Sequence, residues 1–142
     1  MSVTQDQRAA KILVAEDDLE IADMLRMTLM GAGYDVTLVH DGEEALREAI
    51  ASPPELVILD VMMPQMNGWE VCRALRARAE FEDVGILMLT AIGPNLNEMT
   101  APLYGADDHI DKPFVISELL SRLASLLESV RARQGAEASV AR

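Results

Sequence analysis

Residues 56–68 read LVILDVMMPQMNG, an apolar run that ends in Asp60 and leads directly into turn-forming residues. The run is short and continuously apolar, which is typical of a strand buried on both faces of a parallel sheet. In an open parallel sheet the carboxyl ends of the strands lie along one edge, and ligands bind outside that edge. The sequence therefore places Asp60 at a candidate binding site.

Three further segments carry polar side chains at or near their carboxyl ends. The segments are ILVAEDD at 12–18, ILMLTA at 86–91 and DDHIDKPF at 107–114. They supply the acids Glu16, Asp17 and Asp18, the hydroxyl group of Thr90 and the ammonium group of Lys112. We expect these groups to gather at the same sheet edge as Asp60.

Strand-like and helix-like patterns alternate five times along the chain. We expect strands near 12–15, 34–40, 56–60, 84–90 and 106–111, and helices near 19–32, 42–51, 69–79, 91–105 and 115–130. Such alternation favours parallel strands joined by right-handed crossovers. The prediction is a doubly wound α/β fold with a five-stranded parallel sheet of order 2-1-3-4-5. Pro94 and Pro102 interrupt the fourth helical segment, which should be short, kinked or mobile.

The length of 142 residues favours one domain, which we place at 11–130, between flexible termini at 1–10 and 131–142. The formal net charge of −12 argues against direct nucleic-acid binding by this domain and against an anionic membrane surface. The chain contains no apolar stretch long enough to cross a membrane, and its start lacks the apolar segment of a secretory signal. We therefore expect a cytoplasmic protein.

The predicted cluster of acids suits a divalent cation. Converging carboxylates raise one another's pKa unless a cation neutralises them. Mg²⁺ prefers oxygen ligands and commonly combines one or two carboxylates with phosphate oxygens. Acids from two strand ends and a backbone carbonyl near Met62 are the candidate ligands, and we expect Mn²⁺ to be able to substitute.

Asp60 would act beside this cation as a carboxylate nucleophile that forms an aspartyl phosphate. Lys112 would supply a second positive charge, and Thr90 could donate its hydroxyl to a phosphoryl oxygen. Each residue taken alone has a purely structural interpretation, since acids such as Asp17 or Asp18 often cap helices. Compatible groups at four separate strand ends favour a functional site.

The segments ILVAEDD, LVILDVMMPQMNGWEV, ILMLTA and GADDHIDKPF, in this order, closely resemble the receiver domain of bacterial two-component response regulators. The resemblance covers about residues 11–128 and implies a flavodoxin-like (βα)5 receiver fold. It implies that Asp60 accepts a phosphoryl group from a histidine kinase or a phosphotransfer protein. Glu16 and Asp17 match the family's acidic pair, with Asp17 the more direct metal ligand and the Met62 carbonyl another.

The resemblance also implies a switch. Thr90 matches the switch hydroxyl, Lys112 the phosphate-binding lysine, and His109 the switch ring, where the family usually has tyrosine or phenylalanine. Phosphorylation of such domains changes the face formed by the fourth helix, the fifth strand and the fifth helix, so that a downstream protein partner can bind.

We expect a monomer, or a weak homodimer through that same face. Ile92 lacks the basic side chain that is common in regulators that dimerise before binding DNA, whereas Glu118 and Arg122 match those regulators.

Met62 and Ile92, two residues after Asp60 and Thr90, flank the expected path of attacking water. Both side chains are apolar and bulky, so we predict slow self-dephosphorylation. The protein would thus accept a phosphoryl group on its own Asp60, and we do not expect an enzyme that acts on a separate substrate.

Several other interpretations stay open. One is the receiver part of a longer DNA-binding regulator, and another is a docking module that acts without phosphate. A phosphohydrolase usually carries an acid two residues after its nucleophile, where Met62 stands here. A flavodoxin-type electron carrier is disfavoured because the loop after the first strand is acidic and would repel a flavin phosphate.

Overall fold

The computed structural model describes residues 9–90 and 105–140, with side chains described as far as residue 135. Its strands are β1 (Lys11–Ala15), β2 (Asp35–Val39), β3 (Leu56–Asp60), β4 (Gly85–Thr90) and β5 (Asp108–Asp111). All pair in parallel in one sheet of order β2-β1-β3-β4-β5. The predicted α/β fold and its strand order are confirmed.

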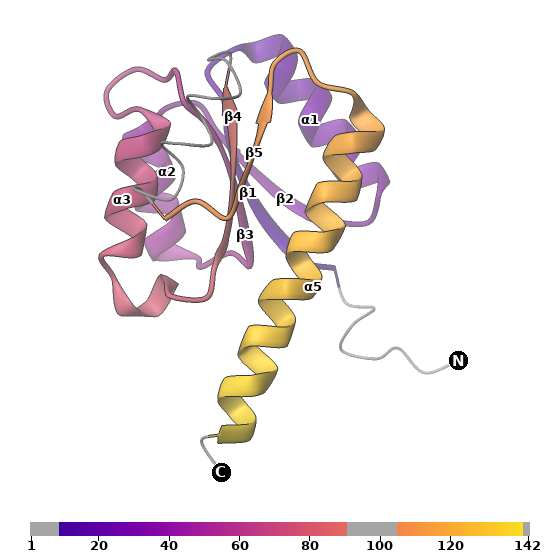
Figure 1. Cartoon of the computed structure of the whole chain (residues 1–142). Helices are drawn as coiled ribbons and strands as arrows, with labels where there is room; N and C mark the ends of the chain where they lie inside the picture. Colours follow the sequence, from indigo (N-terminus) through magenta and orange to yellow (C-terminus); the bar gives the residue numbers. More distant parts are fainter. Residues whose placement is uncertain (1–8, 91–104, 141–142) are drawn as a thin grey trace.

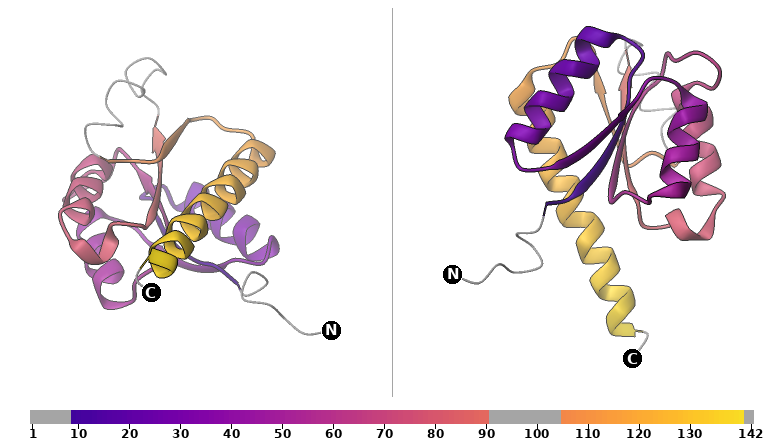
Figure 2. Two further views of the ribbon diagram at one scale, coloured as in Figure 1. Left: turned by 60° about the horizontal axis from the view of Figure 1, so that its bottom comes forward. Right: turned by 180° about the vertical axis from the view of Figure 1, so that it is seen from behind.

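The helices are α1 (Leu19–Gly31), α2 (Gly42–Ala51), α3 (Gly68–Arg76) and α5 (Ile116–Val140), with a 3-10 turn at Ala79–Phe81. Helices α1 and α5 cover one face of the sheet, and α2 and α3 cover the other (Figures 1 and 2). The expected fourth helix and Ile92 fall in 91–104, outside the described residues, as do residues 1–8. No helix in the described part of the chain has the length and hydrophobicity needed to span a bilayer.

Local signals in the sequence explain where the helices begin and end. Asp41 caps α2, because its side chain accepts the backbone N–H of Glu44 at 2.8 Å. Asn67 and Glu70 form a reciprocal capping box at the start of α3. Gly33, just after α1, has φ of +97°, a left-handed conformation that glycine adopts without strain, so α1 stops there.

The core consists of two apolar layers, one on each face of the sheet. Leu75 and Phe81 belong to the layer beneath α2 and α3, and Leu25, Leu29 and Leu123 belong to the layer beneath α1 and α5. Every residue of β3 is buried, because this central strand is covered on both faces. The continuous apolar run that precedes Asp60 follows from that position.

Helix α5 is longer than the sequence analysis predicted. We expected it to end near Val130, with a flexible tail over 131–142, but residues 131–140 are helical. Two ion pairs connect this part of α5 to the rest of the domain. Arg131 Nε lies 3.0 Å from Glu55 Oε2, and an Arg133 nitrogen lies 3.1 Å from Asp107 Oδ1. The partners are far apart in the sequence, so the pattern of the tail alone does not reveal the pairing.

The Asp107 carboxylate connects three elements at the amino-terminal edge of the sheet. One oxygen accepts hydrogen bonds from Arg76 of α3 and from the backbone N–H of Ile86 in β4, both at 2.8 Å. The other oxygen faces Arg133 of α5. Arg76 also donates to the carbonyl of Gly105 at 2.8 Å. Asp107 and its partners, called the Asp107 junction below, therefore connect α3, the start of β4, the segment before β5, and α5.

Replacing Asp107 by alanine should lower the free energy of unfolding by about 2–3 kcal/mol, because charge-assisted hydrogen bonds are lost and two arginines lose a partner. Urea denaturation followed by circular dichroism measures the change. The matched control is Asp23→Ala, which removes an exposed pair with Arg26 and should cost no more than about 0.5 kcal/mol. Equal losses in the two variants would contradict a stabilising role for the junction.

Candidate functional site

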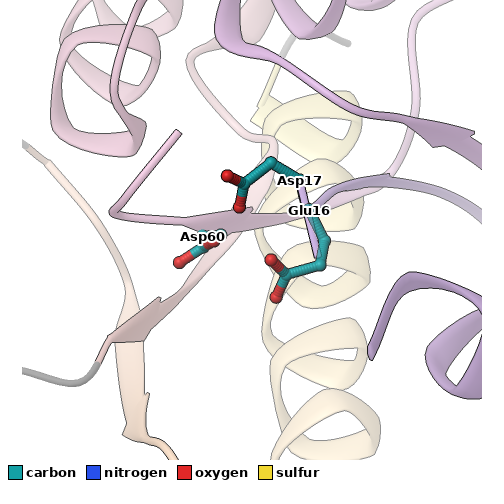
Figure 3. A group of neighbouring side chains, drawn as sticks. All are labelled: Glu16, Asp17 and Asp60. Carbon is teal, nitrogen blue, oxygen red and sulfur yellow. The ribbon is translucent and has the colours of Figure 1, made fainter. Parts of the chain in front are cut away.

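Glu16, Asp17 and Asp60 meet at the carboxyl edge of the sheet (Figure 3). Glu16 and Asp17 directly follow β1, and Asp60 is the last residue of β3, the strand that pairs with β1. One oxygen from each carboxylate lies within 4.8 Å of the other two. Parallel pairing of β1 with β3, which are not consecutive in the chain, therefore produces the juxtaposition that the sequence predicted.

Lys112 reaches into the same cluster from the end of β5. Its Nζ lies 2.7 Å from Glu16 Oε1 and 3.2 Å from Asp60 Oδ1. Its backbone N–H donates to the carbonyl of Thr90 at 2.7 Å, which holds the lysine against the end of β4. The peptide bond between Lys112 and Pro113 is cis.

The environment of Asp60 is unfavourable for a negative charge. The side chain is 3% exposed. Burial, together with the hydrogen bond and the charge of Glu16, raises the pKa of Asp60 to about 7, although Lys112 and the backbone N–H of Met62 oppose the shift. Burial also acts to lower the pKa of Lys112, but the Glu16 and Asp60 carboxylates outweigh it and raise that pKa, so the lysine stays charged. The cluster consequently favours additional positive charge.

The donor set fits a hard divalent cation. The cluster offers carboxylate oxygens, which suit Mg²⁺, Ca²⁺ or Mn²⁺ better than metals that prefer sulfur or nitrogen. Glu16 and Asp60 are buried, whereas Asp17 is exposed, so a cation held here would keep an open side toward solvent. Met62, whose carbonyl we expect to be a further ligand, lies in the loop that follows Asp60, and its N–H donates to Asp60 Oδ1 at 3.2 Å.

The structure separates Asp18 from the three clustered acids. Its side chain caps α1 by accepting the backbone N–H groups of Glu20 and Ile21, at 3.0 and 3.1 Å. Asp18 therefore has the structural role of a helix cap.

Thr90 and His109 lie on the two strands beyond β3. Thr90 is fully buried at the end of β4, the strand that pairs with β3. His109 is half-buried on β5 and lines a pocket of about 320 Å³ between that strand and the start of α5. Arg122 also lines this pocket, where it pairs with Asp108 at 2.8 Å and with Glu118 at 3.5 Å.

His40 also adjoins the site, although the sequence pattern does not predict it. Its ring Nδ1 lies 3.3 Å from the backbone carbonyl oxygen of Glu16. This contact depends on the pairing of β1 with β2, so residue spacing along the chain gives no sign of it.

Comparison with known proteins agrees with this geometry. The response regulator receiver domain family matches residues 12–124. The response regulator MprA of Mycobacterium tuberculosis is 42% identical over 135 residues, which cover 94% of this chain and 57% of the relative. Its counterpart in Mycobacterium avium is 44% identical over 128 residues, covering 89% and 55%. The chain thus spans little more than half the length of these curated relatives.

Solved structures give the same result. The chemotaxis response regulator CheY4 of Vibrio cholerae aligns with a TM-score of 0.79 and 35% identity, over 83% of this chain and 98% of that one. The receiver domain of the sensor histidine kinase PA1611 from Pseudomonas aeruginosa, with a magnesium ion coordinated in its active-site cleft, aligns with a TM-score of 0.78 and 29% identity, over 84% and 98%. The fold and the acidic edge are those of a receiver. The chain belongs to the response regulator receiver domain family.

The raised pKa of Asp60 predicts a pH-dependent stability in the absence of divalent cations. A carboxyl group whose pKa is higher in the folded than in the unfolded protein stabilises the fold most below its unfolded value near 4, and that contribution is lost as the pH rises through about 7. Asp60→Asn should therefore raise the free energy of unfolding at pH 8 by about 1–3 kcal/mol, and by less at pH 5.

Thermal melts in the presence of a chelator test this expectation. Asp23→Asn, which removes an exposed acid on α1, is the matched control and should show no such pH-dependent gain. An Asp60→Asn variant that is no more stable than the wild type at pH 8 would contradict the electrostatic account of the site.

Proposed function

We propose that this receiver domain is a phosphorylation-dependent signalling switch in which Asp60 accepts a phosphoryl group from a histidine kinase or a phosphotransfer protein. The observation that carries the proposal is the position of the Asp60 carboxylate beside Glu16, Asp17 and the ammonium group of Lys112. Membership of the receiver family supports it. The domain is its own phosphoryl acceptor, and no turnover of a separate substrate is part of the proposal.

In the proposed transfer, a carboxylate oxygen of Asp60 forms a bond to phosphorus while the bond from phosphorus to the donor nitrogen breaks, and the electron pair leaves with the donor. Glu16, Asp17, Asp60 and the Met62 carbonyl would hold Mg²⁺, or Mn²⁺ in its place, which when bound offsets negative charge on the phosphoryl oxygens.

Two further residues act on the transferred group. Lys112, already 3.2 Å from Asp60, keeps its charge and is placed to contact a phosphoryl oxygen. We expect the Thr90 hydroxyl, on the last residue of the adjacent strand β4, to donate a hydrogen bond to the product.

The switch would act through β5 and α5. Attraction of Thr90 toward the phosphoryl group, with a change in the position of His109, would shift the population between two arrangements of this face. Arg122 is paired with Asp108 and Glu118 in the present arrangement, so rearrangement of these charges could expose a surface for a downstream protein partner or for a weak homodimer.

A second candidate function concerns the context of the domain. The relatives are longer, and this chain covers 57% of MprA. That observation favours a receiver that belongs to a longer regulator, with DNA binding carried by another part. The chemistry proposed for Asp60 is the same in either case.

Intact mass measured after incubation with acetyl phosphate should show a single phosphate adduct that requires both Mg²⁺ and Asp60. Asp60→Ala should give no adduct, because the nucleophile is gone, whereas Asp23→Ala, an exposed acid on α1, should leave the adduct unchanged. An adduct that persists in Asp60→Ala, or no adduct in the wild type, would refute the proposal. Continuous hydrolysis of a generic phosphate ester would favour a phosphohydrolase.

The apolar side chain of Met62 predicts slow loss of the phosphate. It is 66% exposed beside the site and offers attacking water no hydrogen-bond partner. Met62→Asn combined with Ile92→Glu should accelerate decay of the adduct by about tenfold or more, because the new side chains can orient water. Met27→Asn, a matched change at a 67% exposed methionine on α1, should not alter decay. Equal decay of the double variant and the wild type would show that these residues do not limit water access.

A further inference from the structure

The turn between β2 and α2, residues 40–42, contacts Glu16 through His40 and the loop that follows Asp60 through Gly42. It adjoins Glu16, whose backbone N–H donates to the carbonyl of Val39 at 3.1 Å. The carbonyl oxygen of the same Glu16 lies 3.3 Å from His40 Nδ1, which donates to it in the tautomer that carries a proton on that nitrogen. The backbone of this ligand residue is therefore held from both directions.

The turn also packs closely against the loop that follows Asp60. Gly42, the first residue of α2, is buried, and a Cβ atom placed on it would lie 1.8 Å from the carbonyl oxygen of Met66 and 2.6 Å from the Met66 carbonyl carbon. No side chain fits there unless the backbone of the loop or of α2 moves. Glycine at this position thus sets how close the loop lies to α2.

Both ends of this loop, Val61 and Gly68, are also held by contacts that do not involve Gly42. Val61 N–H donates to the carbonyl of Leu89 in β4 at 2.8 Å, and Gly68 N–H donates to the carbonyl of Val61 at 3.0 Å. A Cβ atom on Gly68 would lie 2.4 Å from the carbonyl oxygen of Asp60, so the end of the loop is also packed against the phosphoacceptor strand. A displacement of Met66 would therefore change the backbone between residues 62 and 66, which is the part of the loop that carries the Met62 carbonyl.

We propose that the β2–α2 turn positions the cation site, because His40 holds the Glu16 backbone and Gly42 sets the place of the Met62–Met66 loop. The inference rests on the proposed function, since it concerns the cation that the acids would bind. His40 and Gly42 are positioning residues: they act through Glu16 and through the loop, and neither is a ligand.

The consequence is selectivity for a small cation. Mg²⁺ requires near-octahedral geometry with oxygens at about 2.0–2.1 Å, whereas Ca²⁺ accepts about 2.3–2.6 Å and variable coordination. A displaced loop should therefore weaken Mg²⁺ binding more than Ca²⁺ binding. A general loss of stability would weaken both in the same proportion.

The test is a titration of the chelator-treated protein with Mg²⁺ and, separately, with Ca²⁺, followed by tryptophan fluorescence. Trp69 is the single tryptophan of the chain and lies in the first turn of α3, directly after the loop. Gly42→Ala should raise the Kd for Mg²⁺ about tenfold and the Kd for Ca²⁺ about threefold or less. Gly31→Ala is the matched control, because a Cβ atom there meets nothing within 4 Å, and it should bind both cations as the wild type does.

A second variant, His40→Ala, removes an exposed side chain and does not crowd the core. It should raise the Kd for Mg²⁺ about threefold, again with a smaller effect on the Kd for Ca²⁺. This variant tests the positioning role even if Gly42→Ala does not fold. Wild-type affinities in these variants, or equal weakening of both cations, would overturn the positioning role alone. A wild-type protein that binds neither cation would overturn the proposed function, and the positioning role with it.

Discussion

The repulsion among three carboxylates at one edge of the sheet is the constraint on which the rest of the site depends. Glu16 and Asp60 are almost fully buried, and burial of charged groups without compensation is unfavourable. Lys112 supplies compensation by lying within hydrogen-bonding distance of both. The pKa of Asp60 nevertheless remains raised to about 7, so the site attracts further positive charge.

The architecture around the site keeps these groups in place. Asp60 ends a central strand whose residues are all buried, so the strand cannot shift without disturbing both layers of the core. The loop after Asp60 is then confined by the backbone contact of Gly68 with that strand and by the contact of Gly42 with Met66. Rigid placement of ligand oxygens is what a cation as demanding as Mg²⁺ requires.

The opposite edge of the sheet has a different chemistry. There Glu55 pairs with Arg131, and Asp107 pairs with both Arg76 and Arg133, so each of the two carboxylates has an arginine partner. The pairs made by Arg131 and Arg133 attach the second half of α5 to the domain. The candidate cation site and the ion pairs that attach α5 therefore lie at opposite ends of the strands.

The sequence by itself determined the strand order, the central strand and the convergence of Glu16, Asp17, Asp60 and Lys112. Each of these follows from short apolar runs and from the rule that parallel strands end at a common edge. Only the tertiary structure decided that α5 continues past Val130 and that His40 and Gly42 adjoin the site. Those features arise from contacts between residues remote in the chain, such as Arg133 with Asp107 and Gly42 with Met66. Hydrophobic periodicity determines which face of an element is buried, but it does not specify which distant backbone or charge will lie against it.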